Sequence, residues 1–228
     1  MPAAMFAIRN YGFESLIRQV KDETHSRHQL DRYDGDEACV SCELTDELAG
    51  TLKQHCRALA CRLCDTLLGE DFMRSLAESG RTLDGRQSLR YYPGSDSLGR
   101  EGSMALGPHV DGTLFTMLWS DGPGLQVCST HEAATRSSSA GLPTIGPSIT
   151  GCVREDEWAE VEQFWEDGML LVTVGQEWID LSKGNESKMM TNVKQATLHR
   201  VSMPSAPRHS IPFLVRVVSD AESKANCW

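Results

Sequence analysis

The sequence predicts a mainly β domain of the α+β class with a layer of helices at its N-terminal end. Two patterns in the 228-residue chain lead to this prediction. Up to about residue 80, apolar residues recur at helical spacing; from Ser88 onward they form short runs separated by Gly, Pro and Asp. We therefore expect a helical region over residues 1–85 and a β domain over residues 86–228.

The clearest helix is expected directly after Thr45, a residue type that commonly caps helix N-termini. Its apolar residues follow steps of three and four and so share one face: Leu48, Leu52, Cys56, Leu59, Ala60, Leu63 and Leu67. Gly69 is a suitable end for this helix. Shorter helices are expected over residues 70–79 and about 14–23, with a polar loop over residues 25–36.

Five apolar runs in the second region predict β-strands. They cover residues 88–92, 113–119, 124–128, 169–174 and 211–218. The segment between the third and fourth runs, residues 129–150, is rich in Ser, Thr, Ala, Gly and Pro and has little periodicity. This composition is typical of an insertion between strands.

Charge and composition narrow the function classes. The formal net charge of −10 argues against a nucleic-acid or anionic membrane surface as partner. The chain contains no apolar run of the roughly 20 residues that span a bilayer, and no secretory signal pattern begins it. We expect a cytoplasmic protein that acts on a small molecule; the sequence does not fix its oligomeric state.

Eight cysteines raise a separate hypothesis. The pairs Cys39-x-x-Cys42 and Cys61-x-x-Cys64 have the spacing of a four-cysteine zinc site. However, Cys61 and Cys64 lie within the expected long helix, without a Gly or Pro to form a ligand turn. Cysteines on an apolar helix face more often pack in the core as small hydrophobic residues.

A possible metal site is formed by three residues. His109 and Asp111 lie two apart in Pro108-His109-Val110-Asp111-Gly112, and His199 lies far downstream. Two histidines and one carboxylate on one side of an ion leave the opposite positions open, as in non-haem Fe(II) oxygenases. On a strand, residues two apart point to the same face, so His109 and Asp111 are expected to reach one ion.

A possible anion site follows nine residues after His199. By the same alternation, Arg208 and Ser210 are expected on one face of a strand, with His209 on the other. The planar guanidinium of arginine suits two-point binding of a carboxylate. Taken singly, each feature has an ordinary structural explanation: a chance surface pair for His109 and Asp111, a core histidine for His199, and a surface ion pair for Arg208.

In combination these residues resemble the isopenicillin-N-synthase-like branch of the Fe(II)/2-oxoglutarate-dependent dioxygenases. The resemblance covers roughly residues 88–215 and is carried by six stretches in the expected order: LRYYP at 89–93, HVDGTLFTML at 109–118, GLQV at 124–127, LVTVG at 171–175, HRV at 199–201 and RHSIPF at 208–213. A weaker similarity, MFAIRNYG at residues 5–12, matches part of the family's N-terminal domain.

The resemblance implies a double-stranded β-helix, or jelly roll, that holds Fe(II) through His109, Asp111 and His199. It implies 2-oxoglutarate as co-substrate, with its far carboxylate bound by Arg208 and Ser210 and with Tyr92 as a further contact. It also implies O₂ as oxidant, ascorbate as reductant, and release of succinate and CO₂ as a small organic substrate is hydroxylated or desaturated.

Several departures from the family pattern bear on function. Arg90 replaces the asparagine that many relatives carry two residues before the tyrosine of the Tyr-Pro pair. Relative to the family, the N-terminal region is expected to be shortened and the C-terminal helices absent. Three alternatives follow: a metal-binding jelly roll without turnover, an Fe(II) oxidase of the same family that does not use 2-oxoglutarate, and a zinc-stabilised interaction protein.

Overall fold

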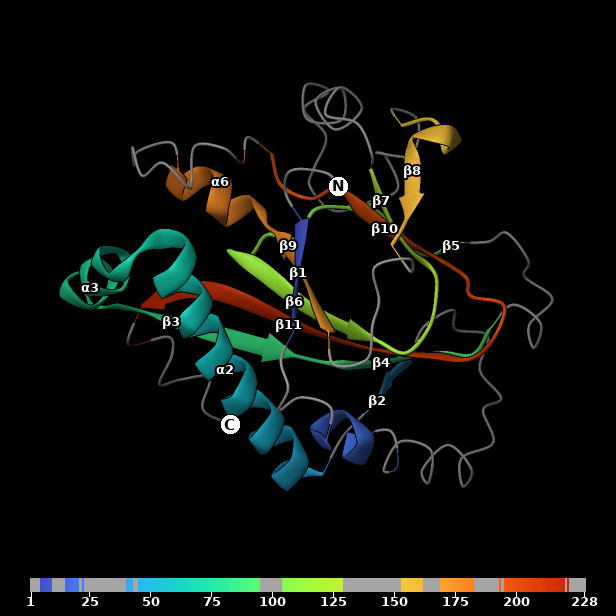
Figure 1. Cartoon of the computed structure of the whole chain (residues 1–228), viewed down its shortest axis with the longest axis horizontal. Helices are drawn as coiled ribbons and strands as arrows, with labels where there is room; N and C mark the ends of the chain where they lie inside the picture. The colour runs from blue at the N-terminus through green and yellow to red at the C-terminus, as the bar shows by residue number, and fades with distance from the viewer. Residues whose placement is uncertain are drawn as a thin grey trace.

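The computed structural model describes residues 5–9, 15–20, 22, 40–42, 45–94, 104–128, 153–161, 169–182, 193, 195–219 and 221. Figure 1 shows the arrangement of these segments. The expected loop at 25–36 and the insertion expected at 129–150 lie outside the described residues, as do Trp165, Cys39, Cys152 and Cys227. The division into regions 1–85 and 86–228 stays a prediction.

Two antiparallel sheets form the core of the described structure. The larger sheet has the strand order β1 (Met5–Arg9), β9 (Met169–Val174), β6 (Phe115–Ser120), β11 (Arg208–Ser219), β4 (Leu89–Tyr92), β2 (Val40–Cys42), and β3 (Arg81–Gln87) also pairs with β11. The smaller sheet has the order β5 (Met104–His109), β10 (His199–Ser202), β7 (Leu125–Cys128), β8 (Trp158–Glu160). This is the predicted α+β class with a jelly-roll core.

Strand β11 shows how one sheet serves two surfaces. The odd-numbered residues Ile211, Phe213, Val215 and Val217 are buried in the cluster that the helices cover. Its even-numbered residues Arg208, Ser210, Pro212 and Leu214 line a cavity on the other face. The period-2 alternation of a strand therefore separates the structural core from a lined cavity within one 12-residue segment.

The helices cover the core face of the larger sheet (Figure 1). α2 (Asp46–Leu68) begins after Thr45 and ends at Gly69, whose φ of 85° lies in the left-handed region that glycine adopts readily. α3 (Glu70–Glu78) follows at once, and residues 15–20 are also helical. The apolar stripe predicted for the long helix faces the core: Leu48, Leu52, Cys56, Leu59 and Ala60 are buried, and Leu63 and Leu67 pack against the same cluster.

All five predicted strands are present, but the structure also contains short or polar elements that the sequence did not predict. β3, β5, β8, β10 and the helix α6 (Gln176–Ser182) lack a clear apolar period. In β3 the reason is visible at Gly85. A Cβ there would lie 2.1 Å from Cζ of Phe213, so the strand uses a glycine where the partner strand places an aromatic ring. This pairing weakens the sequence pattern that identifies a strand.

The cysteines of α2 pack as core residues. The side chain of Cys64 is fully buried, and burial raises the pKa of its thiol to about 12. A raised pKa disfavours the thiolate that zinc requires, which supports the packing interpretation for this residue. The side chain of Cys42 lies outside the described part, so the four-cysteine hypothesis stays open for that pair. No helix in the described segments is long and apolar enough to cross a membrane.

Candidate metal centre and co-substrate cavity

The three residues predicted to bind metal meet at one point. His109 ends β5, His199 begins β10, and the two are register partners across the smaller sheet. Nε2 of His109 lies 3.8 Å from Oδ1 of Asp111, and Nε2 of His199 lies 4.0 Å from Oδ2 of the same carboxylate. Two ligands that share an ion at about 2.1 Å each lie at most about 4.2 Å apart, so both separations allow one ion between them.

The other nitrogen of each imidazole is already engaged. Nδ1 of His109 donates to the carbonyl oxygen of Gly107 at 2.8 Å, and Nδ1 of His199 donates to that of Thr197 at 3.0 Å. Because a carbonyl can only accept, these bonds place the proton on Nδ1 and leave the Nε2 lone pairs directed toward Asp111. Such bonds orient metal-binding histidines and fix their tautomer.

The protonation state of His109 also favours metal binding. Burial lowers the pKa of His109 to about 4, and the neighbouring His199 ring contributes to the same direction. The two ring centroids are 4.2 Å apart. At neutral pH the His109 imidazole is therefore uncharged and its Nε2 can donate a lone pair to a cation. Within the described residues, His109, Asp111 and His199 are the group of potential ligands whose ligating atoms all lie within 4.8 Å of one another.

Asp111 is positioned differently from the sequence-based expectation. It does not share a strand with His109: β5 ends at His109, and Asp111 lies in the turn that follows. Thr116 donates its hydroxyl to Oδ2 of Asp111 at 2.6 Å, which orients the carboxylate. The backbone carbonyl of Asp111 accepts the N–H of Gln176 at 2.8 Å. Tertiary bonds, rather than the pleat of a strand, hold the carboxylate toward the histidines.

This turn packs tightly against the start of α6. The N–H of Gly175 donates to the carbonyl of Leu114, and that of Glu177 donates to the carbonyl of Thr113, both at 3.1 Å. A Cβ added to Gly175 would lie 2.0 Å from the carbonyl oxygen of Thr113. Any larger residue at position 175 must therefore displace the turn that carries Asp111.

We expect Gly175→Ala to weaken Fe(II) binding roughly tenfold and to lower stability by about 1–3 kcal/mol, because the added methyl group overpacks this contact. Anaerobic equilibrium dialysis against Fe(II) measures the first effect and thermal unfolding the second. The matched control is Gly112→Ala, since a Cβ at Gly112 meets no atom within 4 Å. Equal iron affinity in the two variants would contradict the role given to this contact.

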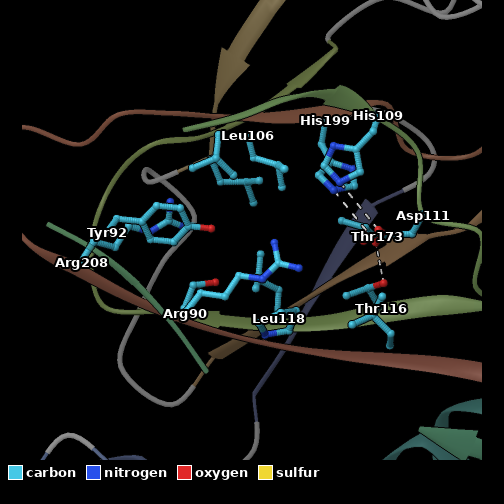
Figure 2. A pocket seen from close by; sticks show the side chains of 15 residues that line it. Arg90, Tyr92, Leu106, His109, Asp111, Thr116, Leu118, Thr173, His199 and Arg208 are labelled. Atoms are coloured by element: carbon cyan, nitrogen blue, oxygen red, sulfur yellow. Dashed lines mark hydrogen bonds and ion pairs between the residues drawn. The ribbon is translucent and has the colours of Figure 1, made fainter. Parts of the chain in front are cut away.

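One cavity connects the histidines to the predicted anion site. All six site residues predicted from the sequence line it: Tyr92, His109, Asp111, His199, Arg208 and Ser210. In Figure 2 the His–Asp–His cluster and Arg208 lie toward opposite ends of the cavity, with the Tyr92 hydroxyl directed between them. Of the nine remaining lining residues, three are polar or charged, namely Arg90, Thr116 and Thr173, and six are apolar: Leu106, Leu118, Leu125, Val201, Pro212 and Leu214.

The Arg208 guanidinium is held in place by neighbouring side chains. Arg208 is 1% exposed, its Nε donates to Oγ of Ser120 at 2.5 Å, and its guanidinium lies 5.2 Å from the centroid of the Tyr92 ring. His209 points the opposite way, as the strand alternation predicts, and contacts Asp121 at 3.0 Å. A buried cation that lines a cavity is a strong anchor for a carboxylate.

Sequence reasoning did not find every functional contact. Thr116 and Ser120 orient Asp111 and Arg208, yet nothing near them in the sequence marks these hydroxyls. The signal that was present is the alternation on β6, where Thr116, Leu118 and Ser120 share a face and Phe115, Met117 and Trp119 pack in the core. None of the described tryptophans lines this cavity: Trp119 and Trp178 are core residues, and Trp158 lies under Arg200.

Solved structures of other proteins have a similar fold. No protein-family model matches the chain, and no curated protein matches it in sequence. Solved structures do. JOX2 in complex with 2OG, Fe and JA has a TM-score of 0.62 at 15% identity, over 95% of this chain and 68% of that one. A full-length Neurospora crassa protein solved with alpha-KG and 5-formyluracil has a TM-score of 0.60 at 15% identity, over 94% and 75%.

A third similar structure is the 2-oxoglutarate complex of dioxygenase for auxin oxidation 1 from Arabidopsis thaliana. Its TM-score is 0.52 at 15% identity, over 92% of this chain and 82% of that one. The identities are low, so the shared property is the fold. The chain has the fold of structures that bind 2-oxoglutarate, and the chemistry must be argued from its own residues.

Proposed function

We propose that this chain is a non-haem Fe(II) enzyme that uses 2-oxoglutarate and O₂ to oxidise a small organic molecule, with release of succinate and CO₂. One observation carries the proposal. A cluster of two imidazoles and one carboxylate opens into a cavity that also contains the buried guanidinium of Arg208. The reaction needs these two sites in one enclosed space.

The donor set fits ferrous iron. Two neutral imidazole nitrogens and one carboxylate oxygen, grouped on one side, are the ligands typical of Fe(II) oxygenases. His109, Asp111 and His199 would hold the ion, and the positions facing the cavity would remain for other ligands. When bound, the iron supplies the redox chemistry that activates O₂. The protein's part is to fix the ligands, through Gly107, Thr197 and Thr116.

Arg208 and Ser210 are proposed to bind the distal carboxylate of 2-oxoglutarate. The fork of guanidinium donors matches a planar carboxylate, and the Ser210 hydroxyl lines the cavity two residues further along the same face of β11. The Tyr92 hydroxyl is directed into the cavity and is proposed as a further donor (Figure 2). These contacts would orient the co-substrate so that its 2-oxo acid end reaches the metal.

The apolar wall is proposed to enclose the substrate. Leucines from β5, β6 and β7, with Val201 of β10, line the same cavity as the metal ligands. Such a wall keeps bulk water from a reactive centre and accepts an apolar substrate carbon. Hydroxylation and desaturation both begin at a C–H bond held in this position, and both belong to the proposal. The particular family proposed is the isopenicillin-N-synthase-like branch, on the sequence stretches described above.

The direct test is release of succinate. Anaerobically purified protein is supplied with Fe(II), ascorbate and 2-oxoglutarate and then exposed to O₂. We expect slow succinate release without substrate and faster release with the correct small molecule. Omitting 2-oxoglutarate identifies an oxidase that does not need it, if a test substrate still turns over. Protein that binds both Fe(II) and 2-oxoglutarate but releases no succinate across a metabolite screen would instead be a binding module.

A further inference from the structure

The proposed function leaves one charged group of the cavity without a role. Arg90 lies on β4, two residues before Tyr92, and its register partner on β11 is Ser210. In Figure 2 its guanidinium extends toward the middle of the cavity, between the histidine cluster and the Arg208 end. In the part of the chain that the structure describes, no hydrogen bond or ion pair engages this guanidinium.

The position of Arg90 is close to the metal site. It lines the same cavity as His109, Asp111 and His199. Arg90 is also partly exposed, whereas Arg208 at the other end of the cavity is buried. The Arg90 side chain is therefore partly open to solvent, whereas the Arg208 side chain is enclosed by the protein.

The formal charges of the cavity indicate that Arg90 needs a negatively charged partner. With the two histidines counted as neutral metal ligands, the charged lining residues are Arg90, Asp111 and Arg208. A bound Fe(II) ion and Arg208 carry three positive charges, and Asp111 with a 2-oxoglutarate dianion carries three negative charges. These groups balance. Arg90 then adds one positive charge that has no counter-ion among the lining groups, the iron and the co-substrate.

We propose that the substrate is a small, largely apolar monoanion and that Arg90 binds its carboxylate. The apolar residues Leu106, Leu118 and Leu125, which line the same cavity, would hold the rest of the molecule with a C–H bond toward the metal. The guanidinium offers two parallel donors to the carboxylate, which fixes orientation as well as charge. This inference rests on the proposed function, because the balance assumes bound iron and 2-oxoglutarate.

The carboxylate that pairs with Arg90 has a second candidate source, namely the carboxylate of 2-oxoglutarate next to its 2-oxo group. The experiment separates the two. Binding of a panel of small apolar carboxylic acids, each paired with its uncharged amide, is measured by ligand-observed NMR on anaerobic protein loaded with Fe(II) and 2-oxoglutarate. We expect at least one acid to bind roughly tenfold or more tightly than its amide, because only the acid pairs with Arg90.

Two substitutions test the residue itself. Arg90→Gln removes the charge and is expected to abolish the preference for acids while changing the Kd of 2-oxoglutarate by less than about twofold. Arg90→Lys keeps the charge and is expected to restore part of the preference. The matched control is Arg86→Gln, an exposed arginine of β3 outside the cavity, which should behave as the unchanged protein.

Two results would overturn the proposal: amides that bind as well as their acids, or an Arg90→Gln variant that loses 2-oxoglutarate affinity to the same degree as acid affinity. The latter would assign Arg90 to the co-substrate. Because binding is measured without O₂, failure of succinate release would reject the proposed reaction while the acid preference is still decided separately.

Discussion

Asp111→Ala is expected to lower the affinity for Fe(II) by at least about 100-fold and to abolish succinate release. The carboxylate is the anionic ligand of the set, and it lies 3.8 and 4.0 Å from the two histidine nitrogens. A methyl group cannot replace an anionic oxygen ligand. Removing the carboxylate also removes the oxygen to which the Thr116 hydroxyl donates its hydrogen bond. Iron affinity is measured by anaerobic equilibrium dialysis, and succinate is quantified by chromatography.

The matched control for this prediction is Asp65→Ala. Asp65 is an exposed carboxylate near the C-terminal end of α2, where a negative charge does not favour the helix dipole. We expect its removal to leave both iron affinity and succinate release unchanged. If Asp111→Ala binds iron as tightly as Asp65→Ala does, then Asp111 is not a metal ligand and the proposed site is wrong.

Arg208→Ala is expected to raise the Kd and the KM for 2-oxoglutarate by about 100-fold while Fe(II) remains bound. The substitution removes a cation that is 1% exposed, and a charge-assisted bond in such an environment contributes about 1.5–3 kcal/mol. The Ser120 hydroxyl also loses the hydrogen bond that it accepts from Nε of Arg208 at 2.5 Å. Some loss of stability is therefore expected, and thermal unfolding must show that the variant is folded at the assay temperature.

Two further variants make the Arg208 result specific. Arg208→Lys keeps the charge but not the planar fork, and we expect a Kd for 2-oxoglutarate between those of the parent protein and Arg208→Ala. Arg216→Ala, at an exposed residue further along the same strand and outside the cavity lining, should leave the Kd unchanged. An unaltered Kd for 2-oxoglutarate in folded Arg208→Ala would remove Arg208 from the proposed co-substrate site.

The sequence was sufficient for the parts of the structure that follow a simple period. The apolar stripe of α2 repeats at helical spacing between a capping residue and a glycine, and both ends were predicted. On β11, alternation alone separates Arg208 and Ser210 from His209, because strand residues two apart share a face. Local chemistry determines these features, so local sequence reveals them.

The remaining features depend on contacts between distant segments. The glycine at position 85 accommodates Phe213 from another strand, and Gly175 accommodates the turn of Asp111. No period in the sequence records either contact. For the same reason the strand geometry expected for Asp111 was wrong: its orientation comes from Thr116 and from the N–H of Gln176, two groups outside its own segment.

Arg90 illustrates a different limit. Its presence in the sequence is plain, but its significance depends on the charges that surround it in the cavity, and these come from β11 and from the turn after β5. The fold is needed before the charges can be compared. The isopenicillin-N-synthase-like branch likewise stays a prediction, because structures similar at 15% identity support the fold and leave the branch to be tested by activity.

The central claim is that His109, Asp111 and His199 bind a common ferrous ion, and counting bound metal tests it most directly. Anaerobic equilibrium dialysis against Fe(II), followed by elemental analysis, should give one ion per chain for the parent protein and for His55→Ala, a histidine of α2 outside the cavity. His109→Ala and His199→Ala should each retain almost none. Full iron occupancy in both of these variants would contradict the account.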